Sequence, residues 1–437
     1  MNIEDTPTEA AHRARVRSYL ADNADRLVHG LGGEGGGEDR IASMRQTQRV
    51  LADGGLVGIT WPTEHGGGGG STMDQVIIDQ ELERAGIPAL IGQIGIGMCG
   101  PTIIAHGSQH QQRLFLARLL RADDIWAQMF SEPGSGSDLA GLTTRATAVE
   151  GGWRVSGQKV WTSGAQWSAW AILLVRTDPG VAKHRGLSML ILDMAAPGVT
   201  IRPLRQMSGD SGFSEVFLDD VFVPAEHVLG AVGDGWRVAL TTLMNERVAL
   251  GGSGGDLGVG IEQLLELARR RLPELSPDEQ ARLHQELGRA YADTLAARMT
   301  GWRRLTALSK GAEPGPEASA GKLAGIALAR RVADLGVRLQ GEDAVFAASS
   351  DGDQRWQYVQ TLLPGLAIAG GTDEVLKNIL GERVLGLAAE PRSDKNVPFR
   401  PERTVPSAPS PAPLPGALLS AAAGRATGEP LLTPTGA

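Results

Sequence analysis

Hydrophobic positions change their spacing along the chain, and the change separates helical segments from strands. Residues 8–125 carry Ala, Leu, Gln and Arg at helical spacing, interrupted by glycine-rich stretches at 30–40 and 62–72. Residues 126–235 contain short apolar runs such as WAILLVRT and LSMLILDM, separated by Gly, Pro and Asp, and this pattern predicts strands. Because no helical crossover separates the runs, we expect a compact antiparallel β-barrel or sandwich.

Helical spacing returns in the last third of the chain. A period of about 3.6 residues predicts helices over 236–252, 257–273, 277–310, 317–341 and 372–386. After about residue 391 the chain is rich in Pro, Ala, Ser and Gly, which is typical of a disordered tail. We therefore expect an α+β multidomain protein with an N-terminal helical domain at 1–125, a central β domain at 126–235, a C-terminal helical bundle at 236–391 and a tail at 392–437.

Composition narrows the class of protein. The 437 residues carry a net charge of −8, so electrostatics give no reason to expect nucleic acid or an anionic membrane as a partner. The first residues are polar and acidic, and no stretch approaches the about 20 apolar residues of a membrane span. We expect a cytoplasmic protein without a membrane span.

Cysteine and histidine give little sign of metal chemistry. Cys99 is the single cysteine, so it predicts a small buried side chain and neither an internal disulfide nor a thiolate-rich metal site. The 8 histidines are dispersed and lack metal-ligand spacing, so we expect no metal. The glycine run at 66–70 is not followed by the Gly-Lys-Ser/Thr of a phosphate-binding loop, which favours a surface loop.

A charged pair interrupts the apolar segment TLMNERVALGG at 242–252. On a helix, Glu246 shares a stripe with Ala239, Leu243 and Leu250, while Arg247 lies on a neighbouring stripe. Adjacent helical side chains point about 100° apart, so the two charges are poorly placed to neutralise one another. Each needs another partner: a ligand in one interpretation, an ordinary ion pair near the surface in the other.

Two further motifs are suited to binding a ring or a phosphate. The turn SEPGSGSD within 126–146 offers hydroxyls and backbone amides. The segment GQKVWTSGAQWSAW then offers Trp161 as a flat face and Ser163 as a hydroxyl, although its tryptophans are equally suited to a core.

Taken together, the chain resembles the acyl-CoA dehydrogenase family of flavoproteins over about residues 40–390. The resemblance rests on FSEPGSGSDLAGL, GQKVWTSGA, SEVFLDDVFVPAEHVLG, NERVALGG and IAGGTDEVLKNILGERVLGL, which occur in the family's order and spacing. It implies a fold of N-terminal helices, a central β domain and a C-terminal helical bundle, with FAD as cofactor.

The resemblance also implies residue roles. The positions that in the family contact the flavin and the thioester arm are Gln128, Phe130, Ser131 and Ser137. Trp161 corresponds to the tryptophan beside the isoalloxazine, and Thr162 and Ser163 to the residues at its N5 side. Thr372 and Glu374 correspond to the distal half of FAD, and Arg271 to a basic residue that reaches a neighbouring subunit's cofactor. Asn245, Arg247, Gly370 and Gly371 correspond to substrate contacts.

One departure concerns the general base. Many family members carry a glutamate immediately before the Gly-Thr of the last motif, where this chain has Gly370. A branch that includes isovaleryl- and long-chain-type enzymes carries the catalytic glutamate directly before the substrate-contacting arginine, as Glu246 precedes Arg247 here. By this resemblance Glu246 removes the α-proton of an acyl-CoA or related thioester and flavin N5 accepts the β-hydrogen as hydride, giving a trans-2-enoyl thioester.

The family also implies partners and a place in fatty acid or lipid metabolism. An electron-transferring flavoprotein is the expected electron acceptor, and a homodimer or homotetramer the expected assembly. The segments at 267–291 and 338–354 lack the family's usual subunit-contact signatures, so one subunit of a heteromeric dehydrogenase is an alternative. A flavin monooxygenase acting on amines or phenols is another, because relatives with this fold need no carboxylate base.

Overall fold

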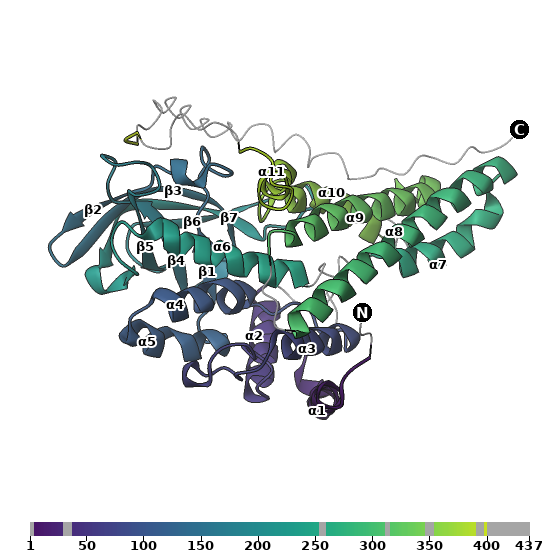
Figure 1. Ribbon diagram of the computed structural model, residues 1–437, viewed down its shortest axis with the longest axis horizontal. Coiled ribbons are helices and arrows are strands. Elements are labelled where there is room, and N and C mark those ends of the chain that lie inside the picture. The colour runs from purple at the N-terminus through teal and green to yellow at the C-terminus, as the bar shows by residue number, and fades with distance from the viewer. Residues whose placement is uncertain are drawn as a thin grey trace, which may run out of the picture. The chain divides into compact units, whose positions relative to one another are not determined.

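Along the chain, helices precede and follow the strands of a central sheet (Figure 1). The computed structural model describes residues 4–28, 37–252, 259–310, 315–345, 354–389 and 397–399, with backbone only at 37, 247–252, 308 and 309. The described residues fall within one compact unit, Met1–Phe399. The tail expected at 392–437 lies outside the described residues except for 397–399.

The N-terminal segment is helical, as its periodicity predicts. Its helices are α1 (Pro7–Asp22), α2 (Gly37–Asp53), α3 (Thr72–Arg84), α4 (Gly100–His106) and α5 (Gln109–Leu120), with a π-helix η3 (Gly95–Cys99) and short turns η1 (Ala24–Arg26) and η2 (Thr63–His65). Capping boxes begin three of them, at Thr6, Ser71 and Ser108. In each box the hydroxyl and the side chain three residues later satisfy backbone N–H groups that the first helical turn leaves unpaired. The sequence therefore specifies these helix starts locally.

The glycine run at 66–70 packs against its own chain. The N–H groups of Gly68, Gly69 and Gly70 donate to the carbonyls of Gly58, Trp61 and Ile59 at 3.2, 2.9 and 2.7 Å. A Cβ on Gly67 would lie 2.3 Å from the Trp61 carbonyl oxygen. The glycines are therefore needed for close approach of the backbone, and their donors are already used inside the protein.

The central strands form one sheet with the hydrogen-bonded order β6-β7-β3-β2-β4-β5-β8, and β1 pairs with β4. Most neighbours are antiparallel, but β4 is parallel to both β1 and β2, which the absence of helical crossovers did not predict. One core, which includes Met129, Val155, Leu173, Leu190 and Val216, draws on β1, β3, β4, β5 and β7, so the sheet curls around it in a barrel-like way. The strands are β1 (Trp126–Met129), β2 (Arg145–Val149), β3 (Gly152–Ser163), β4 (Trp170–Arg176), β5 (Leu187–Asp193), β6 (Val199–Leu204), β7 (Phe213–Pro224) and β8 (Val228–Leu229).

The C-terminal helices agree with the predicted ones except at one place. The helices are α6 (Gly235–Gly252), α7 (Ile261–Arg271), α8 (Pro277–Ser309), α9 (Ala318–Gln340), α10 (Arg355–Ile368) and α11 (Asp373–Arg383). Helix α10 was not predicted, because Pro364 and Gly365 stand inside it and normally end a helix. It is held instead by packing, since Trp356, Val359 and Leu363 are all buried. No helix in the described ranges is long and apolar enough to cross a membrane.

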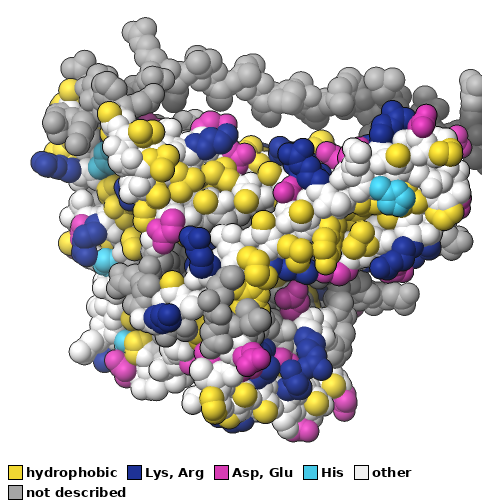
Figure 2. Space-filling model, turned by 45° about the vertical axis from the view of Figure 1, so that its right-hand side comes forward, with side chains coloured by type: hydrophobic (Ala, Val, Ile, Leu, Met, Phe, Trp, Pro, Cys, Tyr) yellow, Lys and Arg dark blue, Asp and Glu magenta, His cyan; other side chains and the backbone are white. Residues whose placement is uncertain are grey.

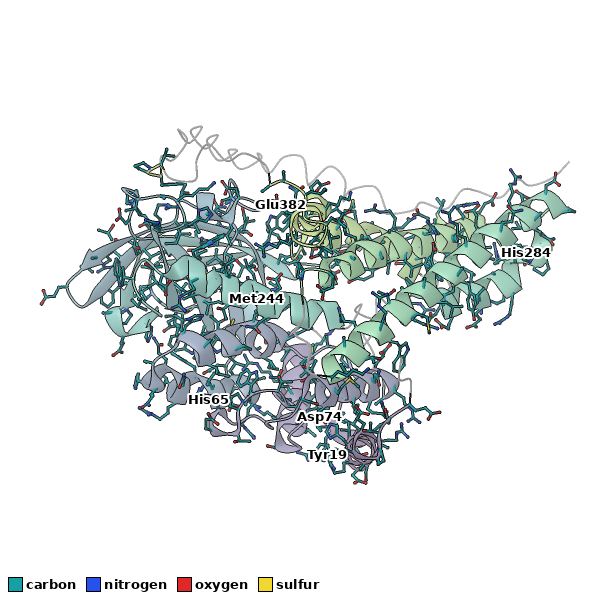
Figure 3. All side chains as sticks on the ribbon, viewed as in Figure 1. Tyr19, His65, Asp74, Met244, His284 and Glu382 are labelled. Atoms are coloured by element: carbon teal, nitrogen blue, oxygen red, sulfur yellow. The ribbon has the colours of Figure 1, made fainter. Side chains whose placement is uncertain are left out.

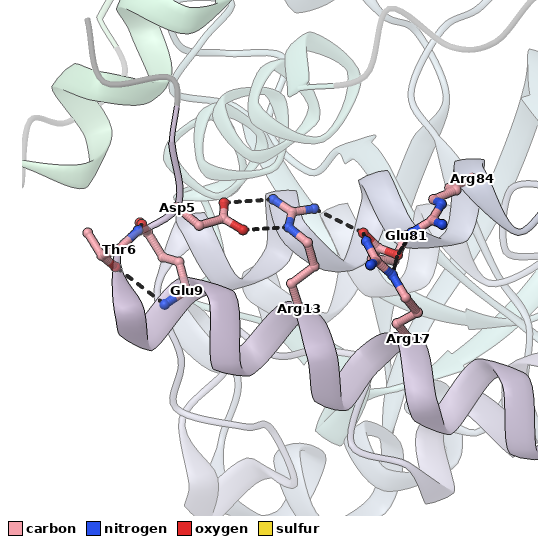
Figure 4. Close-up of polar contacts among 7 residues, drawn as sticks. All are labelled: Asp5, Thr6, Glu9, Arg13, Arg17, Glu81 and Arg84. Atoms are coloured by element: carbon pink, nitrogen blue, oxygen red, sulfur yellow. Dashed lines mark hydrogen bonds and ion pairs between the residues drawn. The ribbon is translucent and has the colours of Figure 1, made fainter.

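An ion network joins α1 to α3 (Figure 4). The Glu81 side chain is 4 % exposed, and its carboxylate accepts from Arg17 at 2.9 Å and from Arg13 at 3.1 Å, with Arg84 3.5 Å away. Arg13 also donates to Asp5 at 2.7 Å. The hydrogen bond from Arg17 holds the pKa of Glu81 below its usual range.

We expect Glu81→Gln to lower the free energy of unfolding by about 1–2 kcal/mol, because charged hydrogen bonds are lost at partly solvated arginines. Since the folded pKa of Glu81 is depressed, this contribution is present above the unfolded pKa of about 4.3 and is lost as pH falls below it. Urea unfolding of both proteins at pH 7 and pH 3.5 measures the difference. Equal gaps at the two pH values would contradict this account of Glu81.

Candidate functional site

Helix α6 carries the charged pair that the sequence singled out. Ala239 is fully buried, Leu243 packs partly against the core, and Glu246 is half-buried, so the predicted stripe faces inward. On the other side Met244, labelled in Figure 3, is 63 % exposed. The side chain of Arg247 lies outside the described residues, as does that of Leu250. The helix therefore directs Glu246 away from its solvent face.

Two hydrogen bonds connect α6 to the sheet through the N-terminal helices: one joins α6 to α4, and the other joins η3, which leads into α4, to β1. The hydroxyls of Thr242 on α6 and Thr102 on α4 are 3.0 Å apart, and both residues are fully buried. Just before α4, the Cys99 thiol of η3 donates to the Ala127 carbonyl of β1 at 3.7 Å. Cys99 is completely buried, as predicted, and burial raises the pKa of its thiol. A π-helix is thus placed between the proposed base helix and the strand that contains Gln128.

Lys322 of α9 binds the turn that begins the IAGGTDE segment and is affected by the charge of Glu246. Its ammonium donates to the carbonyl of Gly371 at 2.6 Å and to that of Ala369. Burial lowers the pKa of Lys322, and the charges of Asp373 and Glu246 oppose that effect. Lys322 therefore binds the Ala369–Gly371 turn and is also affected by the charge of Glu246. Sequence reasoning missed it; the one signal is a lysine within the small-residue run ASAGKLAGIALA.

The turn that replaces the usual base position has a left-handed backbone. Gly370 has φ 64° and Gly371 φ 102°. Such angles favour glycine, because a Cβ would crowd the neighbouring backbone. Thr372 then caps α11, its hydroxyl accepting from the Val375 N–H at 3.3 Å. Glycine at 370 and 371 thus suits this backbone, and Gly370 offers no carboxylate at this position.

A buried ion pair holds the SEPGSGSD loop against β3. Lys159 is fully buried, and its ammonium donates to the Glu132 carboxylate and the Phe130 carbonyl, both at 2.9 Å. Glu132 also accepts from the N–H groups of Thr143 at 2.7 Å and Thr144 at 2.9 Å. Burial by itself would raise the pKa of Glu132, but the Lys159 charge and these donors outweigh it and lower the pKa to about 2. The pair therefore fixes both ends of the loop.

The same part of β3 presents Trp161 to solvent. The Val160 N–H donates to the Ser131 carbonyl at 2.9 Å, which places Phe130 and Ser131 beside β3. The β3–β7 register shifts between Lys159 and Thr162, and Trp161 takes φ 60°, an unusual angle for a non-glycine residue. Its side chain is 59 % exposed, with one ring edge against Phe213. This bulge turns a flat aromatic face outward.

Next to Trp161, Thr162 has a buried hydroxyl. It is 1 % exposed, and its hydroxyl has no hydrogen-bond partner within the described residues. A buried hydroxyl without a partner is costly, and a ligand atom would relieve it. An outward tryptophan, an unsatisfied threonine hydroxyl and the half-buried Ser163 next to it fit the edge and face of a flavin ring. On this observation the residues present fit FAD.

The other predicted site residues lie as follows. Gln128 is half-buried on β1, and Ser137 is exposed at the tip of the loop. Asn245 donates to the Thr241 carbonyl at 3.0 Å within α6. Glu374 is exposed in the first turn of α11.

Arg271, the residue expected to reach a neighbouring cofactor, is engaged inside the chain. It donates to the carbonyls of Leu339 at 3.2 Å and Gln340 at 3.0 Å and pairs with Asp343 at 3.0 Å. It therefore caps the end of α9, where helix carbonyls lack partners.

Family profiles match nearly the whole folded part of the chain. They are "Acyl-CoA dehydrogenase, N-terminal domain" at 6–123, "middle domain" at 127–221 and "C-terminal domain" at 233–385. The acyl-CoA dehydrogenase IpdE1 of Mycobacterium tuberculosis is 38 % identical over 86 % of this chain and 97 % of its own length. The chain belongs to the acyl-CoA dehydrogenase family. This confirms the resemblance and the class, a family of oxidoreductases.

Other relatives extend the comparison. The acyl-CoA dehydrogenase FadE34 of M. tuberculosis is 40 % identical over 87 % of this chain, and the chain spans about half, 51 %, of that relative. Among solved structures, the Tcur3481-Tcur3483 steroid ACAD has a TM-score of 0.75 at 28 % identity, over 89 % of this chain and 100 % of its own. The ChsE4-ChsE5 complex of M. tuberculosis has a TM-score of 0.74 at 32 % identity, with the same coverage. These matches confirm the three-part family fold.

Proposed function

We propose that the chain catalyses FAD-dependent α,β-dehydrogenation of an acyl-CoA or related acyl thioester, with Glu246 as the general base. The observation that carries the proposal is the placement of Glu246: half-buried on the inward stripe of α6, with its charge acting on Lys322, which binds the carbonyl of Gly371. The family's other base position is Gly370, which has no side chain. Family membership supports the reaction class, and the placement supports the choice of base.

The chain's own groups have separable tasks in this reaction. A carboxylate oxygen of Glu246 takes the α-proton, whose acidity the thioester carbonyl provides. Substrate binding expels water and raises the pKa of the carboxyl, which makes it a stronger base. The Gly370 N–H is the donor we assign to the thioester oxygen, where charge develops. Bound FAD supplies a two-electron acceptor for the β-hydrogen, and Trp161, Thr162 and Ser163 are the residues we assign to hold its ring.

Lys322 sets the pH range in which this base works. A nearby cation favours the ionised carboxylate, so Lys322→Met should move the acidic limb of the kcat/KM profile to higher pH, whereas Lys322→Arg should leave it near the wild-type position. Steady-state rates between pH 5.5 and 9 measure the limb. A limb that stays in place in Lys322→Met, with activity retained, would show that another group sets the ionisation.

The substrate class is tested by anaerobic flavin reduction. The purified, FAD-loaded chain is mixed with short, branched, long and steroid side-chain CoA thioesters, the last because one similar structure is a steroid ACAD. We expect at least one thioester to bleach the long-wavelength flavin band. If none does while the flavin stays bound, the dehydrogenase proposal fails and a monooxygenase reaction on this fold gains support.

We further propose that the chain works in an assembly, with an electron-transferring flavoprotein as the acceptor of its electrons. Tyr291, Leu295 and Met299 repeat every four residues on α8 and are 45, 38 and 42 % exposed. Hydrophobic side chains gather along the helical region in Figure 2, and such a stripe suits a subunit interface. The ChsE4-ChsE5 complex supports a second, related chain as an alternative to a second copy. Light scattering of the chain alone, with its FAD content, distinguishes the two: a stable FAD-loaded homo-oligomer would count against the heteromer.

A further inference from the structure

A short segment near the end of the described chain lies against the β domain. The Phe399 N–H donates to the Val181 carbonyl at 2.8 Å, and Pro398 forms a β-bridge with Ala182. The Phe399 ring covers the guanidinium of Arg176, with the Arg176 Cζ 3.5 Å from the ring centroid. We call residues Val397–Phe399 the strap. It lies beyond the part of the chain that the C-terminal family profile matches, which ends at residue 385.

The strap covers a junction between two loops. Arg176 is 4 % exposed, and its guanidinium donates to the carbonyls of Ala140 at 2.6 Å and Leu142 at 3.1 Å in the loop at 130–144. It also donates to the Lys183 carbonyl at 3.1 Å in the loop at 177–186, which is the loop that the strap contacts. A guanidinium under an aromatic face gains attraction when water is excluded. Phe399 therefore shields the hydrogen bonds that connect the two loops.

A second bond joins these loops from their exposed side. The Lys183 ammonium donates to both oxygens of Asp138 at 2.9 and 3.0 Å. Asp138 adjoins Ser137, a residue that we assign to the thioester arm. The position of Ser137 thus depends on the loop at 177–186, and the strap contacts this loop.

We propose that the strap is a positioning element for substrate binding: Phe399, acting through Arg176, holds the loop at 130–144 in the geometry that receives the thioester arm. This inference rests on the proposed function. Cation–aromatic contacts of this kind correspond to about a threefold to tenfold change in an equilibrium. The described contacts of the strap are with Arg176, Val181 and Ala182, on the side of the loop at 130–144, so we expect it to affect binding more than chemistry.

Two shortened chains test the proposal. One ends at Asn396 and lacks the strap, while its matched control ends at Arg403 and keeps it. Both lack residues 404–437, and they differ by the strap and the four residues that follow it, 400–403. Phe399→Ala and Phe399→Trp in the full-length chain repeat the comparison at one residue. We expect the chain ending at Asn396 and Phe399→Ala to raise KM for the thioester about threefold to tenfold with kcat within about twofold.

Hydrogen exchange provides a readout without turnover. The N–H groups of Glu132, Ser135, Gly141 and Leu142 are all bonded within the loop, so their exchange reports its order. Faster exchange confined to 130–144 and 177–186 in the strapless chain, but not in the chain ending at Arg403, is the expected result. Equal KM and equal loop exchange in the two shortened chains would overturn the inference, as would faster exchange everywhere with an unchanged KM. An inactive wild-type protein would refute the proposed function instead, and the loop exchange would still decide the role of the strap.

Discussion

Replacing Glu246 with glutamine is expected to lower the rate of thioester-dependent flavin reduction by about 10²–10⁴-fold, the usual contribution of a positioned general base. The amide keeps the size of the side chain and its position on α6, but it cannot take the proton. FAD content should stay the same, because the residues assigned to the flavin ring lie on β3. Stopped-flow bleaching under anaerobic conditions measures the rate.

Two further variants separate the base from a general effect of charge. Glu246→Asp keeps the carboxylate but withdraws it from the substrate, so we expect an intermediate rate. Glu266→Gln on α7 removes another carboxylate, one that is exposed and paired with Arg270, and it should leave the rate unchanged. Near wild-type reduction by Glu246→Gln would mean that another group takes the proton.

Lys159→Met is expected to lower the free energy of unfolding by about 3–5 kcal/mol, the typical cost of removing one partner of a buried ion pair. The substitution leaves Glu132 inside the protein without the ammonium that neutralises it. It also leaves the Phe130 carbonyl without its donor, so FAD should bind more weakly as well. Urea unfolding of the apoprotein and FAD titration measure the two effects separately.

The double variant Lys159→Met with Glu132→Gln is the control for the charge. Glutamine still accepts from Thr143 or Thr144 but carries no buried charge, so the double variant should be more stable than Lys159→Met alone. In the wild-type protein the pKa of Glu132 is depressed to about 2. Its stabilisation is therefore full above the unfolded pKa of about 4.3 and is lost progressively as pH falls toward 2. Additive effects of the two substitutions would contradict a coupled pair.

Sequence reasoning succeeded where one segment carries its own signal. The period of apolar positions predicted α6, α8 and α9 to within a few residues, since one face of each helix is buried. It failed for α10, because the local preference of Pro364 and Gly365 opposes a helix that tertiary packing of Trp356, Val359 and Leu363 stabilises.

The same division holds for the candidate site. The pattern of α6 by itself indicated that Glu246 points inward, and the resemblance of the motifs to the family predicted which segments adjoin a flavin. Neither could indicate that the charge of Glu246 acts on Lys322, nor that Phe399 covers Arg176, since those pairs are far apart in the chain. Lys159 carries no local signal of its buried ion pair either, because its partner Glu132 lies 27 residues away in the chain.

By itself, then, the sequence determined the order of helices and strands, the local caps, the family and the segments that carry its chemistry. All of these depend on residues close together in the chain, through periodic burial and backbone hydrogen bonding. Only the tertiary structure decided which charges meet and where Val397–Phe399 lies. It also decided that the buried hydroxyl of Thr162 has no hydrogen-bond partner among the described residues. Those outcomes depend on distances between elements, which the packing of the whole unit sets and no local pattern encodes.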